Sequence, residues 1–294
     1  MSDRPWVVVV GDVATDVVVV LSGQPAPGSD RPAAIRTRGG GAGANVAAHL
    51  ARQGVPVALV GCVGDDAAAL GLAAELSAAG VGLLLRTVPG AATGTIVSLV
   101  EPGGQRSMLA DRGANLQLRP DDVPPPVDGQ HLHLSGYTLL DPGPRTAGLT
   151  ALVAAADAGC TVSLDPASTG PLTAYGVDRW LADTARATVL LPNEDEALLL
   201  TGCADAEAAA RTLAARHPVV AVSLGADGAL WASGDVLVHR PAHPTEVVDT
   251  TGAGDAFAAG LLAAWLPDPQ VDPADALDAG LACAAEVVRR PGAR

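Results

Sequence analysis

Short apolar runs alternate with alanine-rich segments of helical length through most of the chain, and this rhythm constrains the fold more than any other feature. Strands that alternate with helices of this length predict a mainly parallel sheet covered by helices on both faces, which is the α/β class. The runs expected to form buried strands are residues 6–10, 57–60, 131–134, 161–164, 188–191 and 219–223. The segments expected to form helices are residues 44–53, 67–79, 145–158, 193–200, 205–215, the stretch after Asp255, and 273–288.

Two stretches break this rhythm. Residues 13–37 contain the apolar run 17–21 and then a turn rich in proline and glycine, with no helical segment. Residues 93–110 contain two β-rich runs around a Pro-Gly-Gly turn, a pattern typical of a hairpin. We expect a small antiparallel sheet, formed from about 13–37 and 93–112 and inserted into the main unit as a lid. No internal repeat or linker divides residues 1–294, so a single domain is predicted.

The composition excludes several kinds of protein. The net charge of −14 argues against a nucleic-acid surface, because phosphate binding needs clustered positive charge. The four cysteines form no CxxC pair, so neither a zinc site nor a disulfide framework is expected. The first residues lack the features of a signal peptide, and no apolar stretch approaches the roughly 18 residues of a membrane span. We therefore expect a cytoplasmic protein that contacts no membrane.

All 18 basic residues are arginine, and lysine is absent. Biased codon usage explains this composition best, but its chemical consequence is independent of the cause. Schiff-base enzymes, pyridoxal-phosphate enzymes, P-loop ATPases and protein kinases all need a lysine. These four classes are excluded.

The segment VVDTTGAGDAFAAGLLAAWL, residues 247–266, ends a strand, turns through small residues and enters an apolar helix. The first amides of a helix carry partial positive charge, and Gly252 and Gly254 let an anion approach them closely. Asp255 at this position should favour its ionised form, and it would still accept a proton from a hydroxyl during phosphoryl transfer. A plain helix cap is an equally good interpretation of Asp255 taken alone.

Two further segments carry weaker signals. In residues 38–54, four glycines precede a helix near Asn45, but no GxGxxG follows the first strand, which excludes the dinucleotide pattern. These glycines fit either a backbone platform for a neutral ligand or a tight turn. In residues 190–202, Asn193, Glu194 and Glu196 crowd the start of a helix. They fit either ordinary stabilisation of the helix dipole or the water shell of a magnesium ion.

The motif DTTGAGDAF closely matches the C-terminal signature of the PfkB/ribokinase family of carbohydrate kinases. The resemblance covers nearly the whole chain, in the family's order: GDVATD, GGGAGAN, GCVGDD, DRGAN, LDP, PNEDE, SLGADG and DTTGAGDAF. It implies a ribokinase-like three-layer sandwich with a mainly parallel central sheet and a small β-sheet lid. It also implies an enzyme that transfers the γ-phosphoryl group of ATP to a hydroxyl of a small ribose- or fructose-like sugar.

The resemblance implies a role for each matched position. Asp255 would deprotonate the sugar hydroxyl, and the anion hole would consist of the amides of Gly252, Ala253 and Gly254. The sugar hydroxyls would bind to Asp16, Gly41 and Asn45. The ATP site would contain Asn193, Ser223, Gly225 and Gly228. Magnesium would be organised, through water, by Glu196 with Asn193, and a monovalent cation, usually potassium, would be held by Asp249 and Thr251. The lid would close over the sugar and form a homodimer interface.

Three departures from the family pattern limit these assignments. Ribokinases commonly have lysine where this chain has Ala42, so its sugar site differs from that of ribokinases proper. The segment where they place a substrate-contacting glutamate reads HLSG, residues 133–136. The loop near residues 290–292, expected to contact the cation, lies close to the last residue of the sequence, and we expect it to depart from the family pattern.

The acceptor is the least constrained part of the function. No Phe, Trp or Tyr occurs between Val7 and Gly136, which disfavours a nucleoside, because nucleobases usually stack on aromatic or arginine planes. Arg106 and Arg112 are candidates for binding a carboxylate or phosphate of the substrate, although solvated surface charge explains any single arginine better. A neutral sugar therefore ranks before a sugar acid or sugar phosphate, and a nucleoside last. A non-catalytic sensor is disfavoured because Asp255 is present, and the histidines show no metal-ligand spacing.

Overall fold

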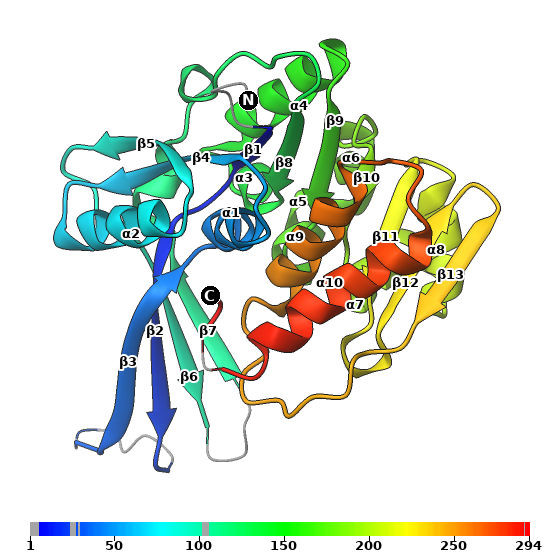
Figure 1. Ribbon diagram of the computed structural model, residues 1–294. Helices are drawn as coiled ribbons and strands as arrows, with labels where there is room; N and C mark the ends of the chain where they lie inside the picture. Colours follow the sequence, from blue (N-terminus) through cyan, green and yellow to red (C-terminus); the bar gives the residue numbers. More distant parts are fainter. Residues whose placement is uncertain (1–5, 24–27, 29, 102–105, 291) are drawn as a thin grey trace.

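The computed structural model describes residues 6–23, 28, 30–101, 106–290 and 292–294, which form a layered α/β fold (Figure 1). The main sheet has the strand order β13-β12-β11-β10-β9-β8-β1-β4-β5. Strands from β11 to β5 pair in parallel, and β12 and β13 add an antiparallel hairpin at one edge. The strands are β1 Val7–Val10, β4 Val57–Gly64, β5 Gly82–Val88, β8 His131–Ser135, β9 Thr161–Asp165, β10 Val189–Leu190, β11 Val219–Ser223, β12 Ala229–Ser233 and β13 Val236–Arg240.

Strand β1 shows how the sheet is buried on both faces. Its side chains alternate, so Val8 and Val10 join one core cluster while Val7 and Val9 join the other. The first cluster contains side chains of α3 Tyr137–Leu140, α4 Arg145–Asp157, α5 Thr169–Tyr175, α6 Val177–Asp183, α7 Glu194–Thr201 and α8 Ala206–Ala214. The second contains side chains of α1 Ala42–Arg52, α2 Ala67–Ala78, α9 Ala253–Trp265 and α10 Pro273–Val287. The predicted α/β class with a mainly parallel sheet is thus confirmed.

The six predicted strands and the predicted helices all occur, whereas β5, β12, β13 and the short helices α3, α5 and α6 were not predicted. The three unpredicted strands lie at the two edges of the main sheet. Strand β5 is half-exposed along much of its length, so it lacks the continuous apolar run of the central strands. No helix in the described ranges is both long and apolar enough to cross a membrane.

A second, four-stranded sheet projects from the main one (Figure 1) and has the order β3-β2-β6-β7. The expectation of an antiparallel sheet is wrong for its central pair, because β2 and β6 are parallel. Both strands leave the carboxyl-terminal side of the main sheet, β2 shortly after β1 and β6 shortly after β5, so they run in the same direction. The Pro-Gly-Gly turn expected in the hairpin lies outside the described residues. The strands are β2 Ala14–Leu21, β3 Ala33–Gly40, β6 Gly94–Val100 and β7 Arg106–Asp111.

Helix α1 begins in close contact with the end of β1. A Cβ atom on Gly43 would lie 2.6 Å from the Cα atom of Gly11, so no side chain fits between these two backbones. Gly41, the N-cap residue of α1, has a φ of 92° in the region that favours glycine. The glycine-rich segment therefore brings the first turn of α1 against Asp12, at the carboxyl end of β1.

We predict that Gly43→Ala lowers the free energy of unfolding by about 1–3 kcal/mol, because the facing backbone of Gly11 cannot move aside. The matched control is Gly71→Ala in α2, where an added Cβ would meet no atom within 4 Å. The control should raise the free energy of unfolding by about 0.5–1 kcal/mol through helix propensity. Urea unfolding measures both, and equal effects of the two variants would contradict the packing argument.

Candidate active site

Several polar side chains gather at the carboxyl ends of the parallel strands, the usual ligand-binding edge of such sheets. Asp12 follows β1, Ser135 ends β8, Asp165 ends β9 and Ser223 ends β11. A cavity of about 440 Å³ opens at this edge. The residues around it that concern the chemistry are Met108, Asp165, Asn193, Glu196, Ser223, Thr251, Gly252, Gly254 and Asp255.

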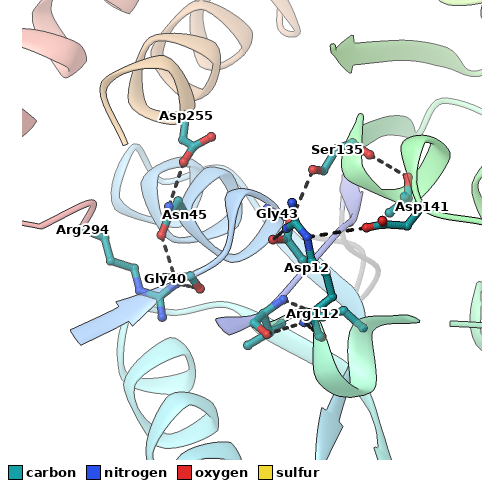
Figure 2. Close-up of polar contacts among 12 residues, drawn as sticks. Asp12, Gly40, Gly43, Asn45, Arg112, Ser135, Asp141, Asp255 and Arg294 are labelled. Carbon is teal, nitrogen blue, oxygen red and sulfur yellow. Dashed lines mark hydrogen bonds and ion pairs between the residues drawn. The ribbon is translucent and has the colours of Figure 1, made fainter. Parts of the chain in front are cut away.

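Asp255 is half-buried in the first turn of α9, and one oxygen of its carboxylate accepts a hydrogen bond of 2.8 Å from the Asn45 side-chain amide (Figure 2). Burial, and then the negative charge of Asp165, raise the pKa of Asp255 well above its usual range. The expectation that the helix N-terminus favours the ionised form is therefore wrong, because desolvation and neighbouring carboxylates outweigh the helix amides. Asp255 is also not the helix cap, since Gly252 occupies that position.

The turn before α9 is shaped to leave its amides accessible. Gly252 has a φ of 76°, and a Cβ there would lie 2.6 Å from the Cα atom of Ala293, so only glycine fits this place. Gly252 and Gly254 line the cavity, and the first amides of a helix have no partner four residues earlier. Ala253 donates a loose 3.2 Å hydrogen bond to the Thr250 carbonyl. The predicted anion hole thus opens into the same cavity as Asp255.

Asp249 and Thr251, the residues expected near a monovalent cation, lie in the loop that leads to this turn. The buried carboxylate of Asp249 accepts hydrogen bonds from the backbone amide of Thr251 (2.8 Å) and from that of Gly292 (2.9 Å). These bonds connect the loop to the segment around Gly292. Pro291, in the middle of the expected cation loop, lies outside the described residues.

On the other side of Asp255 lie Asp16, Gly41 and Asn45, the residues expected to bind sugar hydroxyls. Asp16 lies on β2 beside Gly40 of β3, and burial raises its pKa to about 6, against the opposing effect of Arg294. Asn45 lies on the first turns of α1 and contacts Asp255 directly. Carboxylate and amide groups of this kind are suited to the hydroxyls of a sugar.

Arg112, one of the two arginines proposed for an anionic substrate, is surrounded by acidic and aromatic groups. The guanidinium of Arg112 lies 3.1 Å from Asp12 and 3.5 Å from Asp141, and it stacks 3.6 Å from the ring centre of Tyr137 (Figure 2). Its charge is therefore already balanced by two carboxylates. Arg106 begins β7, opposite Val100 of β6.

The expected nucleotide residues lie around the other end of the cavity. Asn193 and Ser223 are joined by a parallel bridge between the ends of neighbouring strands, and Asn193 caps α7 with the side chain of Glu196 bonded back to it. A second cavity of about 580 Å³ begins at Ser223 and Gly254, which border both cavities. Gly225 and Gly228 lie on its rim, and its wall is largely apolar, with Val247, Phe257, Leu281, Ala284, Ala285 and Val288.

Glu196 and Asp165 place two buried carboxyl groups at the first cavity. Glu196 is only 2% exposed, and burial, together with Asp165, raises its pKa to about 8. Burial likewise raises the pKa of Asp165 to about 6. No group of three or more His, Cys, Asp or Glu side chains in the described part of the chain is arranged to enclose a metal. Magnesium, which keeps several waters and is bound by one or two carboxylates plus phosphates, fits these residues.

Sequence reasoning assigned no role to Asp12, Asp165 or Arg294. Asp12 and Asp165 each occur just where a buried strand ends, a signal that would have found both. Ala167, which follows Asp165 and lines the same cavity, has a φ of 77°, a strained conformation for alanine. Arg294 carries no local signal, because only the fold brings it to α1. The pair His131 and His133 is buried and bonded to hydroxyls of β9, as expected of packed side chains.

Comparison with known proteins agrees with this geometry. Residues 5–294 match the model of the pfkB family carbohydrate kinases. The chain belongs to this family. Its membership makes it an ATP-dependent carbohydrate kinase, whose acceptor is a sugar or a nucleoside. The predicted family and the ribokinase-like fold are thus confirmed.

Three relatives of this pfkB chain are informative. An ATP-dependent ribose-1-phosphate kinase of Halopiger xanaduensis is 36% identical over 275 residues, which span 91% of the chain and 87% of the relative. The aminoimidazole riboside kinase of Salmonella enterica, solved with aminoimidazole riboside and an ATP analogue, has a TM-score of 0.83 and 30% identity, covering 98% of this chain and 94% of its own. A double mutant of the fructokinase of Vibrio cholerae, solved with fructose, ADP and potassium, has a TM-score of 0.84 and 26% identity, covering 100% and 95%.

We predict that Glu196→Gln changes how stability depends on pH. The folded protein holds the Glu196 proton more tightly than the unfolded chain, whose pKa is near 4.5, so the wild type loses stability as pH rises from 4.5 to 8. Glutamine does not titrate and keeps the bond to the Asn193 amide. The variant should therefore exceed the wild type at pH 8 by on the order of 1 kcal/mol or more, and by less at pH 5.

Urea unfolding at both pH values, without nucleotide or magnesium, measures this difference. The control is Glu207→Gln, at an exposed position of α8, which should change the free energy of unfolding equally at both. If Glu196→Gln stabilised the protein more at pH 5 than at pH 8, the argument that burial disfavours the charged form of Glu196 would be contradicted.

Proposed function

We propose that this kinase transfers the γ-phosphoryl group of ATP to a hydroxyl of a small ribose- or fructose-like sugar, with Asp255 as the catalytic base. The observation that carries this proposal is the position of Asp255 between the Gly252–Gly254 turn and the polar side chains Asp16 and Asn45. A phosphoryl group at the turn and a hydroxyl at the polar side chains would then meet beside one carboxylate.

In this arrangement the carboxylate of Asp255 takes the proton of the acceptor hydroxyl as that oxygen attacks phosphorus. Its raised pKa suits this role, because a base is most effective when its pKa approaches the working pH. The amides of Gly252, Ala253 and Gly254 donate to the oxygens of the transferring group, whose charge is spread over them. The weak bond from Ala253 to Thr250 is readily exchanged for such a contact.

The acidic end of the cavity supports a magnesium role. Glu196 and Asp165 would hold the ion through water molecules, with Asn193 beside them, and the ion would screen the charge of the phosphates. We extend the proposal to a monovalent cation beside Asp249 and Thr251, supported by the potassium present in the related fructokinase structure.

The apolar cavity between β11 and α10 would receive the adenosine part of ATP. Its apolar walls would shield the adenine ring from water. The two cavities meet at Ser223 and Gly254, so the phosphates of a nucleotide bound here would extend toward Asp255. Gly225 and Gly228 line this cavity, and their lack of a side chain would leave room for the ribose.

Filling this cavity tests its assignment. Ala285→Trp, on the wall of the cavity, should raise the KM for ATP at least about tenfold while leaving the KM for the acceptor within about twofold, because only the nucleotide loses space. Ala282→Trp, on the exposed side of α10, is the matched control and should change neither. Steady-state kinetics with each substrate varied in turn measures both, and a selective rise in the acceptor KM would sink this assignment.

A free sugar is the leading acceptor, because the groups next to the base are carboxylates and an amide, and Arg112 is already paired with two carboxylates. A sugar 1-phosphate is the second candidate. The observation in its favour is the 36% identity to a relative named as a ribose-1-phosphate kinase. A sugar acid ranks next, and a nucleoside follows, since no aromatic side chain comes from the small sheet.

We also propose that the small sheet acts as a lid and carries a homodimer interface. Met108 of β7 lines the same cavity as Asp255, so this sheet already reaches the site. Ile35, Met108 and Leu109 are large apolar side chains left exposed on its strands. Exposed apolar groups on the edge strands of one small sheet favour contact with another protein surface.

The central test is an assay of ADP formation with ATP, magnesium and potassium across ribose, fructose, ribose 1-phosphate, fructose 6-phosphate, 2-keto-3-deoxygluconate and adenosine. One acceptor should exceed background, and Asp255→Asn should lower its kcat by about 100-fold or more, because asparagine cannot accept the proton. Asp268→Asn, in an exposed turn, is the matched control and should change nothing. Activity that survives in Asp255→Asn, with the fold intact by circular dichroism, would remove Asp255 as the base.

A further inference from the structure

The segment Gly292–Arg294 lies between the turn before α9 and the start of α1. The amide of Gly292 donates to Asp249, and the Ala293 carbonyl lies 2.9 Å from the buried ring of His49 on α1. Ala293 packs against Gly252 of the turn. The segment therefore contacts both sides of the proposed active site without contributing to either cavity described above.

Arg294 reaches from this segment to Asn45. Its side chain is only 1% exposed, and its Nε atom lies 2.8 Å from a carboxylate oxygen of Glu75 on α2. Its Nη1 atom lies 3.3 Å from the side-chain oxygen of Asn45 and 3.4 Å from the Gly40 carbonyl (Figure 2). The guanidinium is thus held by Glu75 on one side and faces the Asn45 amide on the other.

The chemistry of these groups fixes the direction of the Asn45 amide. A guanidinium only donates hydrogen bonds, and an ionised carboxylate, the form in which Asp255 would act as a base, only accepts them. Arg294 therefore requires the amide oxygen, and Asp255 requires the amide nitrogen, which lies 2.8 Å from it. Rotating the amide by half a turn would set donor against donor and acceptor against acceptor. Both neighbours oppose the flipped state, so one orientation is selected.

We propose that Arg294 is a positioning residue for the catalytic base: it sets the Asn45 amide, which in turn holds the Asp255 carboxylate toward the acceptor. We call the contacts from Glu75 through Arg294 and Asn45 to Asp255 the amide relay. The proposal rests on the assignment of Asp255 as the base. The orientation of the Asp255 carboxylate matters for the rate, because small displacements of reacting groups slow a reaction strongly.

Charge supports the same role. Asp16 and Asp255 are carboxylates that face this part of the site, and Arg294 is the cation that lowers the pKa of Asp16 against the effect of burial. Glu75 is nearly half exposed, so its charge is screened by water more than that of the buried guanidinium. Arg294 therefore supplies positive charge near Asp16 and Asp255, in addition to orienting the Asn45 amide.

The test compares Arg294→Met and Arg294→Lys with the wild type, using whichever acceptor the enzyme phosphorylates. Arg294→Met should lower kcat about tenfold to a hundredfold, with the KM for ATP unchanged within about twofold, and Arg294→Lys should recover part of the loss because lysine still donates. In an Asn45→Leu background, Arg294→Met should cost less than about threefold, since the group through which it acts is gone. Arg186→Met, which removes a comparable but exposed ion pair with Asp157, is the control and should leave kcat unchanged.

A second measurement separates the amide relay from the proposed function. In the protein without substrates, the side-chain NH₂ signals of Asn45 in nitrogen-15 NMR spectra should show slowed solvent exchange, and Arg294→Met should abolish this protection. Retained protection, or a kcat within twofold of wild type in a folded Arg294→Met protein, would overturn the amide relay. Absence of any acceptor phosphorylation by the wild type would instead overturn the proposed function, and the NMR comparison would then decide the amide relay alone.

Discussion

The accumulation of carboxylates at one poorly solvated edge of the sheet is the constraint on which the site depends. Asp16, Asp165, Glu196 and Asp255 all have raised pKa values, and burial is the largest cause for each. An apolar replacement would stabilise the fold, so their presence indicates that this edge is built for ligands that bring cations and hydroxyl groups. The raised pKa values express the energetic cost of holding these carboxyl groups in poorly solvated positions before a ligand arrives.

Two kinds of structure hold these groups in place. The parallel strands deliver Asp12 and Asp165 directly, because strand ends align at one edge. Asn45 and Asp255 come instead from helices 210 residues apart in sequence, and their contact depends on the glycines that bring α1 and α9 close to the sheet and to the segment Gly292–Arg294. The strands therefore fix where the site lies, and the helix starts fix its chemistry.

Much of this was predictable because its signals are local. The alternation of strands and helices predicted the main sheet, and the motif around Asp255 predicted a turn that leads into a helix, which is α9. The raised pKa of Asp255 was not predictable, because it arises from Asp165 and from burial, which depend on the folded arrangement. The parallel pairing of β2 and β6 and the contacts of Arg294 also join distant segments that no local pattern relates.

The parallel pair in the small sheet has a mechanical consequence. Because β2 follows β1 and β6 follows the edge strand β5, with β4 between these two strands of the main sheet, the small sheet is attached at two separate places rather than at one. Such an attachment leaves rocking about the line that joins these two places as the softest motion and resists twisting or sideways displacement. One of these attachments lies beside Asp12, which contacts both α1 and Arg112. A tilt of the small sheet would therefore also move the residues around Asp12, next to the proposed acceptor site.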